Sequence, residues 1–99
     1  MTREIVWSPA AEKDLENISE YLNNKWNSKV ALSFINKIEK STLLISNNPR
    51  IFSLINKKLG IRKCVVTKHN SLFYRENSSN RIEIIRLFDN RQHPKKLTF

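Results

Sequence analysis

Two apolar stripes at helical spacing, close together in the first half of the chain, constrain the fold more than any other feature. Apolar residues recur every three or four positions from Ala11 to Leu22, and a second stripe runs from Ala31 to Ile45. This spacing places apolar side chains along one side of a helix, which other elements must then cover. A short, mostly polar segment, residues 23–28, separates the stripes, so we predict an antiparallel helical hairpin.

The flanking residues indicate where these helices begin and end. Ser8 precedes Pro9, which is typical of a helix start because serine caps the free N–H groups and proline is favoured at the first helical position. The second helix is predicted to end at Asn47–Pro49, since the residue before a proline disfavours helical backbone.

The remaining β-prone residues predict a small sheet. The predicted strands are Glu4–Trp7, Ile61–Thr67, Ser71–Glu76 and Arg81–Phe88, with residues 77–80 as a turn. The fold is therefore predicted to be α+β, in the order β-α-α-β-β-β, with the N-terminal helical hairpin packed on a small antiparallel sheet and the first strand at its edge. Residues 50–59 are expected to form a loop that packs in part and projects in part. The chain of 99 residues, 1–99, is predicted to be a single domain.

The last predicted strand contains an arginine that breaks its apolar pattern. Strict alternation puts Ile82, Ile84 and Arg86 on one face and Arg81, Glu83 and Ile85 on the other. Arg86 is then expected either to extend to the rim of the sheet or to be held by a carboxylate. Asp89, three residues further on, is the favoured partner.

The net positive charge of the chain favours anionic partners but does not indicate which kind. The chain has 18 Lys and Arg against 9 Asp and Glu, a formal net charge of +9. Such a charge favours encounter with RNA, DNA, acidic membranes or acidic proteins, and it also keeps a small domain in solution. No segment has the apolar length of a signal peptide or a membrane span. We therefore expect a cytoplasmic protein with no membrane partner.

Several classes of site are excluded by residue counts. Cys64 is the single cysteine and lies in an apolar run, so a buried, inert thiol is expected. His69 and His93 are far apart and no zinc-type spacing occurs, so no metal site is predicted. One glycine, Gly60, cannot supply a phosphate-binding or dinucleotide-binding loop. No cofactor is therefore expected.

Basic and polar residues in the second half are the remaining candidates for chemistry: Lys57, Lys58, Arg62, Lys63, Lys68, Tyr74, Arg75, Arg86, Arg91 and His93. Metal-free RNA cleavage needs a base, an acid and cations around the phosphate. Arg62, Arg86 and His93, with Tyr74, could supply these groups. The simpler interpretation is that the arginines hold strand ends, that Tyr74 is a core ring with a solvated hydroxyl, and that His93 is a surface imidazole.

Four segments together resemble the RelE/ParE toxin superfamily over nearly the whole chain: Ser8–Leu15, Asn47–Pro49, Gly60–Lys63 and Ile82–Arg91. The resemblance implies a growth-inhibiting toxin of a type II toxin-antitoxin system. It also implies a cognate antitoxin that neutralises the toxin by wrapping it with an extended or helical segment, in a toxin-antitoxin hetero-oligomer.

The superfamily has two branches, and the sequence is closer to the ParE branch. The start Ser8-Pro9-Ala10, the long hairpin and the ending Arg86–Arg91 are similar to ParE, although Asp89 stands where that branch usually has histidine. This branch implies a toxin that blocks DNA gyrase without being a nuclease. The residues expected to bind the target or nucleic acid are Lys57, Lys58, Arg62, Lys63 and Arg91.

The RelE branch is the alternative. High charge, Arg62 at the start of a strand and the late His93 are similar to RelE, which implies a metal-independent endoribonuclease that cuts messenger RNA in the ribosome. Under that alternative Arg62, Arg86 and His93 are the catalytic residues. A third alternative is a non-toxic accessory protein that binds nucleic acid.

Overall fold

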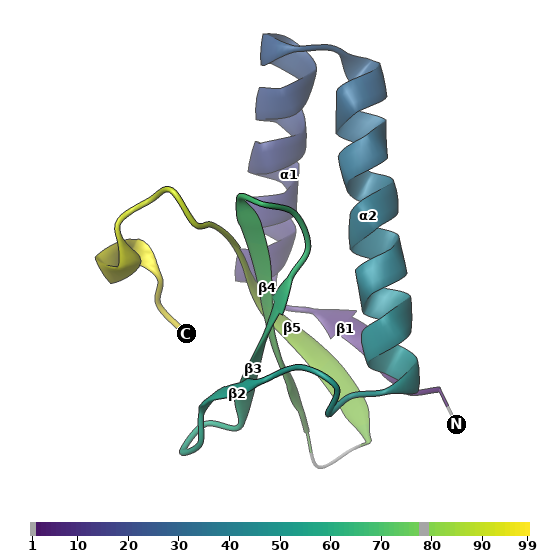
Figure 1. Cartoon of the computed structure of the whole chain (residues 1–99), viewed down its shortest axis with the longest axis vertical. Coiled ribbons are helices and arrows are strands. Elements are labelled where there is room, and N and C mark those ends of the chain that lie inside the picture. The colour runs from purple at the N-terminus through teal and green to yellow at the C-terminus, as the bar shows by residue number, and fades with distance from the viewer. Residues whose placement is uncertain (1, 78–79) are drawn as a thin grey trace.

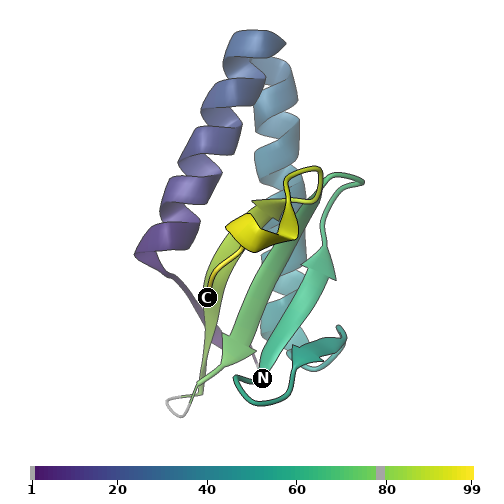
Figure 2. The same ribbon diagram turned by 90° about the vertical axis from the view of Figure 1, so that its left-hand side faces the viewer.

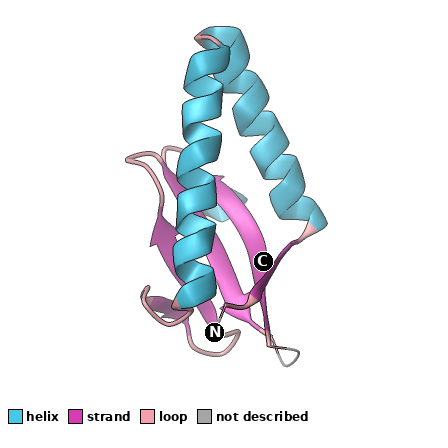
Figure 3. Cartoon of the chain, turned by 90° about the vertical axis from the view of Figure 1, so that its right-hand side faces the viewer, coloured by secondary structure: helices cyan, strands magenta, loops and turns pink. Residues whose placement is uncertain are grey.

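The computed structural model describes residues 2–77 and 80–99, arranged as two layers. A helical hairpin covers one face of a sheet that has five strands in the described part of the chain (Figures 1 and 3). The elements are β1 (Glu4–Trp7), α1 (Pro9–Lys25), α2 (Ser28–Asn47), β2 (Leu54–Asn56), β3 (Ile61–Val65), β4 (Asn70–Glu76), β5 (Arg81–Asp89) and a 3-10 turn, η1 (Pro94–Lys96). The predicted α+β class with its helical hairpin is confirmed.

The first helix begins at its predicted cap, Ser8, and the second begins after Asn27, whose capping role was not predicted. Ser8 Oγ accepts a hydrogen bond from Ala11 N at 3.1 Å, and Asn27 Oδ1 accepts one from Val30 N at 3.0 Å. Each cap satisfies a free N–H group of a first helical turn. The second helix ends at Asn47 as predicted, whereas the first continues to Lys25 and leaves a shorter connection than expected.

The sheet has the strand order β1-β5-β4-β3-β2 and differs from the prediction in two ways. β1 lies at an edge as expected, but it pairs with β5 in parallel, with Ile5 opposite Ile82. β2 was not predicted; it lies within residues 50–59 and pairs antiparallel with β3. The sheet is therefore mixed. Ser78 and Ser79 of the predicted turn lie outside the described residues.

The main core lies between the hairpin and the sheet. Its buried members are Ala11, Phe34, Ile38, Ile45, Cys64, Leu72, Tyr74, Ile82, Ile84 and Leu87. Cys64 is buried as predicted, and burial raises the pKa of its thiol. Because only the thiolate is an effective nucleophile, this cysteine is a packing residue.

A second, smaller cluster lies on the opposite face of the sheet, here called the outer face. It comprises Ile61, Phe73, Ile85 and Phe88, with Leu97 packed against them. Figure 2 shows the last residues of the chain crossing in front of the sheet with the helices behind it. We call residues 94–99 the C-terminal strap. Its Phe99 ring lies 5.4 Å from the Phe73 ring, centroid to centroid. The strap therefore covers apolar side chains that strands alone leave exposed.

A β-bulge in β5 changes the predicted faces of this strand. Ile84 lies opposite Tyr74, but Arg86 lies opposite Phe73, so Ile85 is an extra residue. Tyr74 belongs to the main core and Phe73 to the outer cluster. Directly opposed residues share a face of the sheet. The prediction that Arg86 faces the same way as Ile84 is therefore wrong.

Candidate functional site

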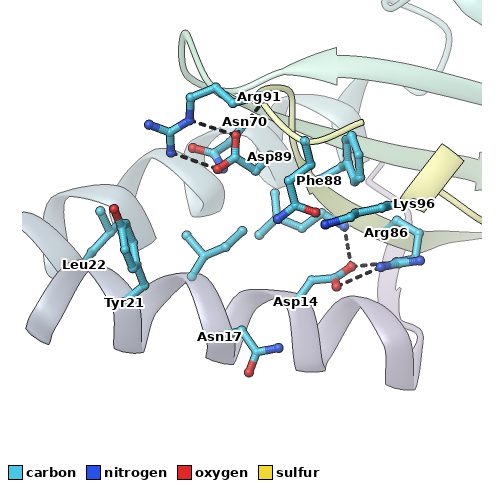
Figure 4. Close-up of a pocket in the computed structure, with 13 residues that line it drawn as sticks. Asp14, Asn17, Tyr21, Leu22, Asn70, Arg86, Phe88, Asp89, Arg91 and Lys96 are labelled. Atoms are coloured by element: carbon cyan, nitrogen blue, oxygen red, sulfur yellow. Dashed lines mark hydrogen bonds and ion pairs between the residues drawn. The ribbon is translucent and has the colours of Figure 1, made fainter. Parts of the chain in front are cut away.

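Arg86 is held by a carboxylate of the first helix. Its Nε and Nη2 donate to the two carboxylate oxygens of Asp14 at 2.7 and 3.0 Å (Figure 4). Asp14 also accepts the backbone N–H of Leu87 at 3.1 Å. The expectation of a carboxylate partner is correct, but the choice of Asp89 is wrong. This ion pair joins the start of α1 to β5 at the bulge.

Asp89 instead pairs with Arg91. Nε and Nη2 of Arg91 donate to its two oxygens at 3.0 and 2.8 Å, and the Arg91 backbone N–H adds a third bond. These bonds hold the pKa of Asp89 below its usual value. Arg91 is exposed, but its charge is largely neutralised by this neighbour.

Arg62 and Tyr74 fasten the segment that follows α2 to the sheet. Arg62 Nη1 donates to the Phe52 carbonyl at 2.7 Å, and the Tyr74 hydroxyl donates to the Pro49 carbonyl at 2.8 Å. The Tyr74 ring is buried as predicted. Its hydroxyl is bonded within the protein, so the expectation that it is solvated is wrong. Arg62 lies opposite Tyr74 and therefore on the helix-covered face.

Stability should depend on Tyr74 at high pH. Burial raises its pKa to about 12, above the value near 10 of an exposed tyrosine, so the unfolded chain releases this proton first. The stabilisation is complete below about pH 10 and is lost as pH rises toward 12. Relative to Tyr74→Phe, wild type should lose on the order of 2 kcal/mol of unfolding free energy between about pH 9 and 12. Urea titrations check this, and parallel pH curves for the two proteins would contradict it.

The structure does not bring Arg62, Arg86 and His93 together. Arg62 lies on the helix-covered face, whereas Arg86 lies opposite Phe73, which belongs to the outer face, with β4 between their strands. His93 is exposed, and its Nδ1 accepts the backbone N–H of Lys95 at 3.1 Å. Both arginines donate to protein acceptors. Arg62 is thereby bonded to the segment after α2 and Arg86 to α1, so the two guanidinium groups are held by different parts of the protein.

The five residues predicted to bind a target are divided between two ends of the sheet. Lys57 and Lys58 are exposed in the turn before β3, which Gly60 completes with a φ of +70°. Lys63 is half-buried on the outer face, opposite Phe73. Within residues 2–77 and 80–99 these three lysines form no ion pair. Their charges are therefore available to a partner, whereas Arg91 lies beyond the opposite end of β5.

Arginines supply most ion pairs of the described chain, so lysines carry much of its free positive charge. The remaining arginine pairs are Arg3–Glu76, Arg50–Glu76, Arg75–Glu83 and Arg81–Glu4. Glu76 thereby links the chain start to the segment after α2. In the same described part of the chain, no group of three or more His, Cys, Asp and Glu residues could hold a metal ion.

Sequence reasoning missed Asp14, although a signal was present. Asp14 lies three residues after Ala11 and four before Ile18, so it occupies the apolar side of the predicted first helix. A carboxylate there needs a cationic partner. Asp14 and Arg86 line a groove of about 470 Å³ between α1, the end of β5 and the strap (Figure 4).

The fold and site together define a small RelE/ParE-type domain, and comparison with known proteins specifies the family. A sequence model of the "ParE toxin of type II toxin-antitoxin system, parDE" matches residues 5–94. The chain therefore belongs to the ParE toxin family, as its sequence suggested. No curated protein sequence matches it.

Solved structures share the fold at low sequence identity. The chromosomal ParDE system of P. aeruginosa superposes with a TM-score of 0.75 at 17% identity, covering 89% of this chain and 96% of the other. A YoeB/ParE toxin from Agrobacterium tumefaciens gives 0.64 at 16% identity, covering 87% and 96%. The RelBE2 toxin-antitoxin complex of Mycobacterium tuberculosis gives 0.61 at 16% identity, covering 90% and 99%.

No helix in the described part of the chain is long and apolar enough to span a membrane.

Proposed function

We propose that this ParE-family toxin inhibits DNA gyrase by binding it and that a cognate antitoxin neutralises the toxin. The observation that carries the proposal is that Arg62 and Arg86 lie on strands separated by β4 and that each is already bonded within the protein, Arg62 to Phe52 and Arg86 to Asp14. A nuclease of the alternative kind would need these cations around one phosphate. A toxin that acts by binding needs only an accessible surface, which Lys57, Lys58 and Lys63 provide.

The antitoxin proposal rests on the family and on charge. Two of the similar structures, ParDE and RelBE2, are described as toxin-antitoxin systems or complexes. A domain with a net charge of +9 favours a partner segment with acidic residues. We expect co-expression with the adjacent short reading frame to yield a complex that survives purification. Failure of the two chains to copurify would contradict this part of the proposal.

A gyrase assay tests the proposed target. Purified toxin in micromolar excess should reduce supercoiling of relaxed plasmid by gyrase or increase the amount of cleaved DNA. Replacing Lys57, Lys58 and Lys63 together by alanine should weaken this effect severalfold, because exposed charges at an interface chiefly change the association rate. Replacing Lys13, Lys29 and Lys40 together by alanine is the matched control, because it removes the same three charges from exposed positions in the helical layer.

Experiments with the same protein distinguish gyrase inhibition from the two alternative functions. Unchanged supercoiling and unchanged cleavage at micromolar excess would exclude gyrase as the target. New 5′ ends within codons of translated messages would instead support the ribosome-dependent nuclease. Harmless expression of folded protein without antitoxin would support a non-toxic accessory protein.

A further inference from the structure

The end of the helical hairpin exposes two aromatic rings. Tyr21 is 47% exposed and Trp26 is 64% exposed. The Lys25 ammonium lies 5.4 Å from the centre of the Tyr21 ring, within the range of a cation–π contact. This end of the hairpin projects beyond the sheet (Figures 1 and 2). The rings are therefore open to a partner and serve no evident purpose in the core.

A groove of about 410 Å³, here called the tip groove, lies against these rings. Its lining residues are Tyr21, Leu22, Lys25, Trp26, Val30, Ser33, Phe34, Lys37, Thr67, His69, Asn70 and Arg91. No carboxylate is among the described residues that line it, although Asp89, next to the groove, pairs with Arg91 and leaves the positive charge to the lysines. Lys25 and Lys37 form no ion pair with any described residue. The groove is therefore positive, with aromatic walls.

Hydrogen bonds fix the side of the tip groove opposite the hairpin. The Thr67 hydroxyl donates to Asn70 Oδ1 at 2.9 Å, and Val66 N donates to the Asn70 carbonyl at 2.9 Å. Asn90 N donates to the His69 carbonyl at 2.6 Å and ties this turn to the end of β5. A groove whose wall is already ordered loses little entropy when a ligand binds.

The chemistry of the tip groove favours one class of ligand. Bases stack on exposed aromatic rings, and cations without competing carboxylates attract phosphates. An acidic peptide could use the cations, but only its occasional aromatic residues could stack on the rings, whereas every nucleotide carries both a phosphate and a planar base. We propose that the tip groove binds single-stranded nucleic acid, with bases on Trp26 and Tyr21 and phosphates at Lys25 and Lys37. This binding does not depend on gyrase.

Fluorescence measurements on the full chain test the tip groove. A fluorescein-labelled oligothymidylate of about 12 nucleotides reports binding by anisotropy, and the unlabelled strand should quench tryptophan emission. Trp26→Ala should weaken binding about 10-fold and abolish the quenching, and Trp26→Phe should retain part of the affinity. Trp7→Phe is the control, because Trp7 packs against the main core and should not contribute to quenching. Circular dichroism confirms that each variant is folded.

Paired lysine variants separate a local site from general charge attraction. Lys25→Ala with Lys37→Ala should lower the slope of log affinity against log salt by about 1.4, as expected for two lost phosphate contacts. Lys13→Ala with Lys40→Ala removes the same charge from the same two helices away from the groove, and should change the slope little. Equal effects of the two pairs, or full affinity in Trp26→Ala, would overturn the proposal.

Two further results would overturn it in favour of another ligand. Equal binding of duplex DNA without tryptophan quenching would indicate backbone attraction alone. An acidic peptide of glutamate and leucine that quenches Trp26, where oligothymidylate does not, would assign the groove to a protein partner. None of these measurements uses gyrase or growth. A negative result would therefore contradict the proposed nucleic-acid site without contradicting the proposed toxin target.

Discussion

Replacing Asp14 by alanine is expected to lower the free energy of unfolding by about 3 kcal/mol. The Asp14 and Arg86 side chains are only 17% and 19% exposed. The variant would leave two guanidinium N–H groups and the Leu87 backbone N–H without their acceptor. Loss of one partner from a buried pair costs about 3–5 kcal/mol, and the partial exposure here favours the lower end.

Urea unfolding of matched variants measures this effect. Glu16→Ala, two residues along the same helix, removes an exposed carboxylate whose pair with Lys13 spans 3.7 Å, and should cost less than about 0.5 kcal/mol. Arg86→Ala combined with Asp14→Ala should be less damaging than the sum of the single variants, because no unpaired charge remains. Additive costs would mean that the two side chains do not stabilise the fold as a pair.

The helices were predictable because their signals are local. The caps at Ser8 and Asn27 and the apolar spacing within each helix lie within a few turns of the residues they organise. The parallel pairing of β1 with β5 was not predictable in this way. In the sequence, the whole hairpin and most of the sheet lie between these two strands. The sequence of a four-residue strand also does not indicate whether it will pair in parallel or antiparallel.

The candidate site was harder to predict because it depends on register. One inserted residue, Ile85, reverses the face of every later side chain in β5, and the sequence pattern contains no glycine or proline that indicates a bulge. The partner of Arg86 is 72 residues away along the chain. Asp89 lies only three residues from Arg86, but the packing of α1 on β5 brings Asp14 to Arg86 instead.

The centre of the outer face is apolar, although basic side chains are numerous in the second half of the chain. Phe73 is 3% exposed and lies among Ile61, Ile85 and Phe88 beneath the C-terminal strap. Leu97 and Phe99 complete its surroundings. A partner could reach the middle of this face only after the strap had moved. Accessible charge therefore lies around this apolar centre, at the turn that carries Lys57 and Lys58 and at the half-buried Lys63.

Replacing Phe73 by alanine tests whether the outer cluster is a true core. The change removes a buried ring and leaves a cavity, which costs about 3–4 kcal/mol. The melting temperature of a chain of this size should then fall by about 15 °C or more. Val65→Ala is the matched control, because Val65 is 60% exposed near the end of the neighbouring strand β3 and should cost less than about 1 kcal/mol.

The contact between Phe99 of the strap and Phe73 provides a second test of the outer cluster. Phe99 is 50% exposed, so Phe99→Ala should cost only about 1 kcal/mol. In the Phe73→Ala background this cost should fall by about 0.5–1 kcal/mol, because the contact between the two rings is already lost. A cost below about 1 kcal/mol for Phe73→Ala would mean that the strap does not bury this face. In that case the outer face would be open, and a partner could contact Lys63 and Phe73 together without displacing any part of the toxin.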